Sequence, residues 1–265
     1  MKEIQSRANP LFRQWLHDKA HAGRPGHLVW LEGPHLCQSW LQNQLEVKWL
    51  LIDQTRFDHP EVVQIRNQID PANWVVISTS LFDALSDVKS HQGVTLLADL
   101  PAREIPVDIH GSAVVLDGIQ DPGNVGTLLR TCAAAGIQTV IANAGTAGCW
   151  SPKVLRSAQG AHAGLHIHET RDASDWLRAY RENASSLPVI ATTLEEATSL
   201  FSMRLPARAI WIFGSEGQGV SSEMLSLADH RVRIDHNQQY VESLNVATAA
   251  ALCLFEQARQ HRTGR

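Results

Sequence analysis

The sequence predicts an α/β fold with a mostly parallel sheet, preceded by a smaller α/β domain. Apolar strand-like runs alternate with helical segments along almost the whole chain of 265 residues, a pattern typical of strand–helix–strand units. The alternation pauses at residues 100–106, where two prolines and a charge pair are typical of a linker. We therefore expect a first domain at residues 1–100 and a second at residues 107–265.

Composition restricts the class of protein. The chain is 44% hydrophobic, which is enough for a full core, and it carries a net charge of −4. This charge argues against indiscriminate binding of polyanions but leaves room for a local basic patch. The four cysteines form no C-x-x-C pair, so we expect reduced thiols in a cytoplasmic protein, with no metal site. No run reaches the ~20 apolar residues of a membrane span, and we expect a soluble chain.

The first domain is expected to form a small α/β layer. Strands are expected at residues 27–31, 47–52, 74–78 and 94–98. Helices are expected at residues 9–20, 34–42, 60–68 and 81–86. Five of the eight tryptophans lie in this domain. Because aromatic residues at element spacing usually pack, we expect most of them in the core, with base stacking as the alternative.

The second domain repeats the alternation on a larger scale. Strands are expected at residues 113–116, 138–142, 165–168, 188–192, 209–213 and 230–234. Helices are expected at residues 124–135, 151–159, 173–183, 195–201, 221–228 and 243–260. One helix between successive strands predicts a mostly parallel sheet that is covered on both faces.

The first predicted helix of the second domain follows a turn that contains glycine and proline. We expect Asn124 to cap the start of this helix and Gly136 to end it in a left-handed conformation. Arg130 lies off the apolar face, so its side chain can reach solvent or a ligand. The turn follows the carboxyl end of a strand, where α/β sheets place their sites.

A second glycine turn occupies residues 210–220. An apolar strand leads directly into three glycines within six residues, with Glu216 between them. Glycine lets a ligand approach the backbone closely, and the carboxylate of Glu216 can accept a hydrogen bond or orient a cation. The turn lacks the lysine of a P-loop and the spacing of a dinucleotide fingerprint. A tight structural turn is the alternative interpretation.

The last predicted helix is apolar on nearly all sides, because only Thr248 is polar between residues 246 and 255. We therefore expect it to be buried against its own sheet and against a second chain. Ser243 is the expected cap of this helix. For Asn245, in the expected first turn, a purely structural role is the alternative to a functional one.

These stretches, in this order, resemble the three motifs of the SpoU or TrmH family of RNA ribose 2′-O-methyltransferases. The matching residues are Asn124 with Arg130, the turn Gly214-x-Glu216-x-x-Gly219, and Ser243-Leu244-Asn245-Val246. Residues 151–157, Ser-Pro-Lys-Val-Leu-Arg-Ser, look like the S-P-K-x-x-R segment of the family. The resemblance spans roughly residues 108–260. The first domain is similar in length and pattern to the substrate-binding domain that many members carry.

The resemblance implies a homodimeric enzyme with a deep trefoil knot at the C-terminal end of the sheet. It implies that S-adenosylmethionine donates a methyl group to a ribose 2′-hydroxyl of ribosomal or transfer RNA. The loops implied to hold this cofactor are those around Thr192, Gly214, Ile234 and Leu244.

The resemblance also implies which residues act at the ribose. They are Arg130, Asn124, Glu216, Ser243 and Asn245. Because a guanidinium group stays protonated, we expect the arginine to clamp the phosphate and polarise the hydroxyl, and we leave the general base open.

A separate role is implied for two basic residues of the S-P-K-x-x-R segment. Lys153 and Arg156 are expected to contact RNA phosphates, with a solvated helix face as the alternative.

The sequence departs from the family before the third motif. The family usually has Ile-Pro-Met and then a glycine, whereas Ile234 is followed here by Asp-His-Asn-Gln-Gln-Tyr in a loop that is one residue longer. This polar loop, residues 235–241, supports an alternative function: a non-catalytic RNA-binding or ribosome-assembly protein that keeps the knot and has weakened cofactor binding. A general nucleotide-binding domain is a third possibility, against which the missing phosphate-binding lysine argues.

Overall fold

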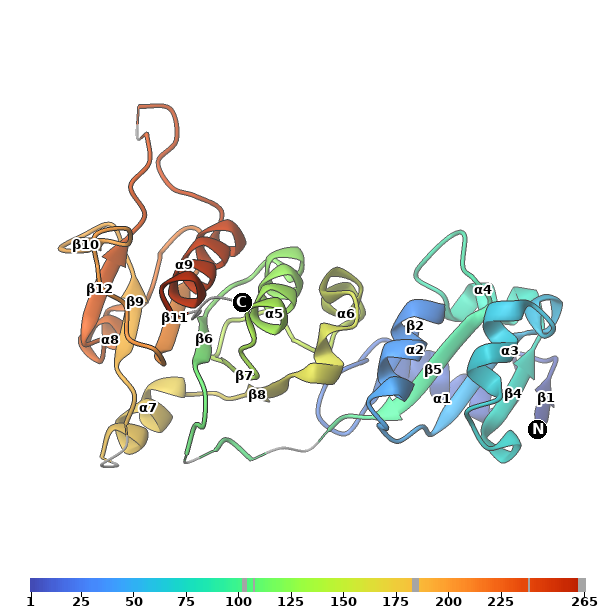
Figure 1. Ribbon diagram of the computed structural model, residues 1–265. Coiled ribbons are helices and arrows are strands. Elements are labelled where there is room, and N and C mark those ends of the chain that lie inside the picture. The colour runs from blue at the N-terminus through green and yellow to red at the C-terminus, as the bar shows by residue number, and fades with distance from the viewer. Residues whose placement is uncertain (102–103, 107, 183–185, 238, 262–265) are drawn as a thin grey trace. The chain divides into compact units, whose positions relative to one another are not determined.

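The chain folds into two compact units, each built around one sheet (Figure 1). The computed structural model describes residues 1–101, 104–106, 108–182, 186–237 and 239–261. The first unit comprises Met1–Ala102 with Trp150–Ala163, and the second comprises Arg103–Cys149 with Gly164–Arg265. The predicted linker includes residues 102 and 103, which lie outside the described residues. In the described ranges, every helix is too short or too polar to cross a membrane.

The first unit contains a five-stranded mixed sheet in the order β1-β4-β3-β5-β2. Its strands are β1 (Lys2–Ile4), β2 (Leu28–Glu32), β3 (Trp49–Asp53), β4 (Trp74–Ile77) and β5 (Val94–Asp99). Strand β5 is antiparallel to β3 and β2, and the other pairs are parallel. Strands β2 to β5 match the predicted strands within two residues at each end. Strand β1 was not predicted, because three residues are too few to show a period.

Helices cover both faces of this sheet. They are α1 (Pro10–Lys19), α2 (Pro34–Gln42), α3 (Pro60–Arg66), α4 (Thr79–Leu85) and α6 (Pro152–Ala158). Helices α1 and α4 bury one face together with Trp15 and Trp30, while α2 and α3 pack on the other with Trp40. These three tryptophans are at most 3% exposed, which confirms the prediction that most of them belong to the core.

The second unit contains a seven-stranded sheet in the order β10-β12-β9-β11-β6-β7-β8. Its strands are β6 (Ala113–Asp117), β7 (Thr139–Ala142), β8 (His166–Glu169), β9 (Val189–Thr192), β10 (Thr198–Ser199), β11 (Ile210–Gly214) and β12 (His230–Arg233). All pairs are parallel, which confirms the predicted α/β class. The carboxyl ends of the strands therefore meet at one edge of the sheet.

Helices also cover both faces of the second sheet. They are α5 (Pro122–Ala135), α7 (Ala173–Arg181), α8 (Ser222–Ser226) and α9 (Val246–His261). Helices α7 and α8 pack on one face, and α5 and α9 lie side by side on the other. The buried amide of Gln257 ties α9 to the sheet, because its Oε1 accepts a hydrogen bond of 2.9 Å from Nε1 of Trp211.

The helix predicted at residues 195–201 was wrong. This stretch forms a turn, in which Glu196 adopts a left-handed φ of 48°, and then the short strand β10. Strand β10 pairs with β12, so that Thr198 lies beside Val232. Pairing at the edge of the sheet therefore overrides the helix propensity of the local sequence.

Candidate active site

Three segments that are far apart in the sequence meet at the carboxyl edge of the second sheet. Asn124 lies near the start of α5, Glu216 follows β11, and Asn245 precedes α9. Nδ2 of Asn124 donates a hydrogen bond to Oε1 of Glu216, and Oδ1 of Asn124 accepts one of 2.9 Å from Nδ2 of Asn245. We call this arrangement the Asn–Glu–Asn junction. It brings together one predicted residue from each of the three motifs.

The residues that cap α5 and α9 differ from those predicted. As a result, the side chain of Asn124 is available for the junction. Asp121 caps α5, because its Oδ1 accepts a hydrogen bond of 2.8 Å from the backbone N–H of Asn124. The cap at the start of α9 is Asn245, whose Oδ1 accepts from the N–H groups of residues 247 and 248, and not Ser243. The amide of Asn124 is consequently available to bind other side chains. Gly136 ends α5 with φ 82°, as predicted.

The glycine turn after β11 requires glycine at its first position. A Cβ atom on Gly214 would lie 2.0 Å from the carbonyl carbon of Gly219 and 2.1 Å from the backbone nitrogen of Val220. The turn is closed by two backbone hydrogen bonds between Ser215 and Gly219, of 3.1 and 2.9 Å. It therefore presents bare backbone at the sheet edge, with the exposed carboxylate of Glu216 at its tip.

The other predicted cofactor residues lie at the ends of neighbouring strands. Thr192 ends β9, and its Oγ1 donates a hydrogen bond of 3.2 Å to the backbone oxygen of Ile212 in β11. Ile234 follows β12, which pairs with β9 so that Val232 lies beside Thr192. Leu244 is half-buried and directly precedes the junction residue of α9. The parallel register thus brings three of the predicted loops to one edge, and the junction brings the fourth.

Sequence reasoning missed a buried carboxylate that supports this edge. Asp117, which is 6% exposed, ends β6. Its Oδ1 accepts from Nδ2 of Asn143 and its Oδ2 accepts from the backbone N–H of Ser221, both at 2.8 Å. Oδ1 of Asn143 in turn accepts from the N–H of Ala173. The signal in the sequence was an aspartate at the end of an apolar strand, directly before Gly118.

Arg130 is exposed on α5, the helix whose first turn carries Asn124. In the part of the chain that the structure describes, its guanidinium group forms no ion pair. The buried thiols nearby are chemically inert, because burial raises the pKa of Cys132 in α5 and of Cys253 in α9 to about 12. Arg130 is thus an exposed cation of α5 whose charge no carboxylate among the described residues compensates.

The two predicted RNA-contacting residues of the S-P-K-x-x-R segment lie on α6, in the first unit. Lys153 is exposed. Arg156 is half-buried, with its Nη1 3.5 Å from Oδ2 of Asp87. The structure thus gives the arginine a partner within its own unit, and the lysine faces solvent.

The loop that departs from the family projects from the second unit between β12 and α9 (Figure 1). Its start is fixed, because Asp235 accepts a hydrogen bond from Ser199 and one of 2.9 Å from Nε of Arg233. These two bonds, that of Ser199 first, lower the pKa of the Asp235 carboxyl group. Farther along the loop Tyr240 is 80% exposed. Residue 238 lies outside the described residues.

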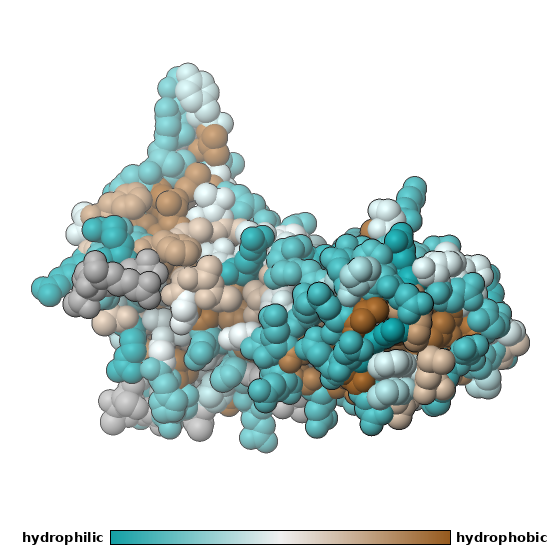
Figure 2. Space-filling view, turned by 45° about the vertical axis from the view of Figure 1, so that its right-hand side comes forward, coloured by the Kyte–Doolittle hydropathy of each residue, from teal (hydrophilic) through white to brown (hydrophobic). Residues whose placement is uncertain are grey.

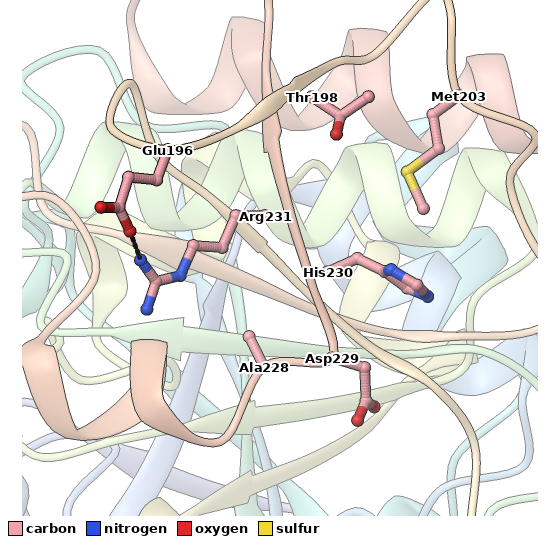
Figure 3. Close-up of a pocket in the computed structure, with 7 residues that line it drawn as sticks. All are labelled: Glu196, Thr198, Met203, Ala228, Asp229, His230 and Arg231. Atoms are coloured by element: carbon pink, nitrogen blue, oxygen red, sulfur yellow. Dashed lines mark hydrogen bonds and ion pairs between the residues drawn. The ribbon is translucent and has the colours of Figure 1, made fainter.

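A cavity of about 400 Å³ lies elsewhere in the second unit, beside the edge strand β10 and its neighbour β12. Figure 3 shows its lining, in which the ion pair between Glu196 and Arg231 spans one side. The lining comprises Glu196, Thr198, Met203, Ala228, Asp229, His230 and Arg231. None of the predicted site residues belongs to it. Because it includes the first residues of β10 and β12, it lies at the amino end of these strands, opposite to the junction.

The glycine turn yields a paired prediction. Replacing Gly214→Ala forces the backbone of residues 219 and 220 to move, and we expect the free energy of unfolding to fall by about 1–3 kcal/mol. Gly217→Ala is the matched control, because a Cβ atom there meets nothing within 4 Å. Urea unfolding measures both. Equal stabilities of the two variants would contradict the tight turn.

Comparison with known proteins identifies relatives along the whole chain. Residues 111–255 match the SpoU rRNA Methylase family. The chain is 30% identical over 260 residues to the 23S rRNA (guanosine(2553)-2'-O)-methyltransferase RlmP of Bacillus subtilis, which covers 96% of this chain and 98% of that protein. It is 33% identical over 261 residues to an uncharacterized tRNA/rRNA methyltransferase of Synechocystis, which covers 97% of this chain and 93% of that protein.

Solved structures share the fold. One is an RNA 2'-O ribose methyltransferase with a TM-score of 0.76 at 27% identity, covering 97% of this chain and 98% of that chain. Another is the SpoU methyltransferase AviRb from Streptomyces viridochromogenes in complex with AdoMet, with a TM-score of 0.83 at 23% identity, covering 97% of this chain and all of that chain. The chain matches the family model over more than half of its residues and a relative over nearly its full length, and it therefore belongs to the SpoU rRNA methylase family.

Proposed function

We propose that this protein is an RNA methyltransferase that transfers a methyl group from S-adenosylmethionine to a ribose 2′-hydroxyl, with ribosomal RNA as the substrate. The observation that carries the proposal is the Asn–Glu–Asn junction, which joins all three family motifs at the carboxyl edge of a parallel sheet. The relatives named above are methyltransferases of rRNA or of tRNA and rRNA, and no observation favours the non-catalytic alternative.

The residues at the sheet edge fit S-adenosylmethionine. Three strand ends and the glycine turn offer backbone N–H and C=O groups. At Gly214 the backbone lies so close to residues 219 and 220 that a side chain would clash with them. Thr192, Ile234 and Leu244 complete the proposed lining. When bound, the cofactor supplies an electrophilic methyl group on a sulfonium centre.

The chemistry requires that a weak nucleophile be held in line with this methyl group and lose its proton. Arg130 remains protonated, so its role is to bind the phosphate next to the target ribose and to donate a hydrogen bond to the hydroxyl. Asn124, Glu216 and Asn245 hold α5 and the two loops in place, and Ser243 lies exposed just before the junction. Lys153 is assigned a phosphate contact, and Arg156 the same contact once its partner Asp87 is displaced.

A knotted and dimeric form accounts for two further features. Strands β11 and β12 are inserted between strands that precede them in the sequence, as a chain end threaded through a loop requires. Helix α9 leaves Leu252 and Phe255 about 40% exposed, whereas Ala250 is packed within its own chain. Figure 2 shows hydrophobic residues gathered on the second unit beneath the projecting loop. A second copy of the chain would cover such a surface.

Methyl transfer tests the proposed function. We expect the protein to label unmodified rRNA from radioactive S-adenosylmethionine, with the label on a ribose 2′-oxygen. Arg130→Ala should reduce the rate at least 100-fold and leave cofactor affinity within twofold of wild type, because its target is the RNA. Isothermal titration with the cofactor is the control. A wild-type protein that transfers no methyl group would refute the function, and equal loss of cofactor affinity would refute the role of Arg130.

The oligomeric state tests the role of α9. Phe255→Glu places a charge on the exposed side of the helix, and we expect it to convert a dimer to a monomer at micromolar concentration. Gln138→Glu, an exposed position before β7, is the matched control. Sedimentation equilibrium measures both variants. A wild-type monomer, or a Phe255→Glu dimer of unchanged affinity, would contradict the assignment.

A further inference from the structure

The first unit carries its charges unevenly. Residues 1–27 contain five Lys or Arg and two Asp or Glu, whereas residues 28–101 contain four Lys or Arg and nine Asp or Glu. Apart from Lys153 and Arg156 of α6, the excess of positive charge therefore belongs to residues 1–27, which comprise β1, α1 and the turns around them. The remainder of the unit is acidic, so a polyanion that approaches it is steered toward α1.

A row of cationic and imidazole side chains follows the exposed side of α1. Arg13 and His17 are four residues apart in α1, so they project from the same side, opposite to the buried Phe12 and Trp15. His21 follows the end of α1, and its Nδ1 lies 3.1 Å from the backbone oxygen of His17. The ring centroids of His17 and His21 are 5.0 Å apart.

The turn after α1 continues this row. His21 stacks on His27 with centroids 4.9 Å apart and an interplanar angle of 21°. Backbone hydrogen bonds from Arg24 to His21 and from His27 to Arg24 fix the turn, so the exposed Arg24 stands next to the rings. We call Arg13, His17, His21, Arg24 and His27 the basic stripe.

The charges of the basic stripe are available to a ligand. Within the described residues neither Arg13 nor Arg24 forms an ion pair, whereas Lys19 is 14% exposed and paired with Asp87 at 3.3 Å. Among the described residues the carboxylate near the rings is Asp18, which lies 3.5 Å from Nδ1 of His27 and 3.8 Å from Nδ1 of His17 and is only 15% exposed. Asp18 therefore contacts imidazole rings and leaves the positive charges of Arg13 and Arg24 uncompensated.

We infer that the basic stripe is an RNA-docking surface of the first unit, an inference that rests on the proposed function. Arg13 and Arg24 bind backbone phosphates, and the exposed ring of His17 stacks on an unpaired base. Arginine suits this role because its planar group binds phosphate through two hydrogen bonds and also stacks. The ring stack favours RNA over an anionic membrane, since nucleobases offer faces for the imidazoles.

The test removes the two charges and compares a matched control. Arg13→Gln/Arg24→Gln should weaken binding to an unmodified 23S rRNA transcript about tenfold and raise the KM for RNA to a similar extent. The slope of log affinity against log salt should become shallower by roughly 1.4, about 0.7 for each lost single-strand phosphate contact. The control Arg56→Gln/Lys89→Gln removes the same charge at two exposed positions outside the basic stripe and should bind RNA like wild type.

The outcomes separate this inference from the proposed function. The midpoint of urea unfolding and the circular dichroism spectrum must equal those of wild type in both double variants, which shows that the first unit is folded, and cofactor affinity by isothermal titration must also be unchanged. Wild-type affinity of Arg13→Gln/Arg24→Gln, an equal loss in the control, or a loss of binding to anionic lipid vesicles alone would overturn the docking surface. If wild type itself neither binds nor methylates the transcript, the proposed function fails and the inference fails with it.

Discussion

The candidate site depends on one amide that binds in two directions. Asn124 donates to a carboxylate after β11 and accepts from the amide of Asn245 before α9. A side chain needs both a donor and an acceptor to hold these two loops at once, which asparagine has and an ionised aspartate lacks. Glu216 and Asn245 are separated from it by 92 and 121 positions in the sequence. The junction therefore fixes the distances between loops that the chain itself leaves unconnected.

The parallel sheet of the second unit brings the loops that Asn124 joins to the same edge. Because all seven strands run in the same direction, every strand of the second unit delivers its following loop to the same edge. The buried carboxylate of Asp117 links the end of β6 to Asn143 after β7 and to Ser221 before α8. Hydrogen bonds to a buried charge are strong and costly to lose, so these loops behave as one rigid base. The exposed residues of the site, among them Arg130, are held by these loops and by the helices that follow them.

Much of this arrangement could be predicted from the sequence. Long apolar runs between helices fix the parallel sheet, and three short motifs in the right order indicate the family. Details that depend on tertiary contacts could not be predicted. Asp121 and Asn124 are both good caps, and only the packing of three loops decides which one caps the helix. Residues 195–201 have helical propensity, but two of them, Thr198 and Ser199, pair with β12 as the edge strand β10. The two partners of Asp117, Asn143 and Ser221, are brought to it by the order of the strands in the sheet, which the local sequence does not contain.

The two units also divide the work of recognition. The second offers bare backbone at a sheet edge and the exposed guanidinium of Arg130 on α5, which suits a small cofactor and a ribose. The first offers two arginines and a group of neighbouring imidazoles on α1 and on the turn after it, which suits the backbone and bases of a longer RNA. An acidic chain can in this way bind RNA at chosen places without binding polyanions in general.

Hydrogen exchange of backbone amides, with and without S-adenosylmethionine, tests the central claim most directly, namely that the loops tied together by Asn124 form the cofactor cradle. The account predicts slower exchange at residues 214–219 and at the start of α9, with no change around the cavity beside β10 and β12. Slower exchange at that cavity alone, or no change at saturating cofactor, would contradict it.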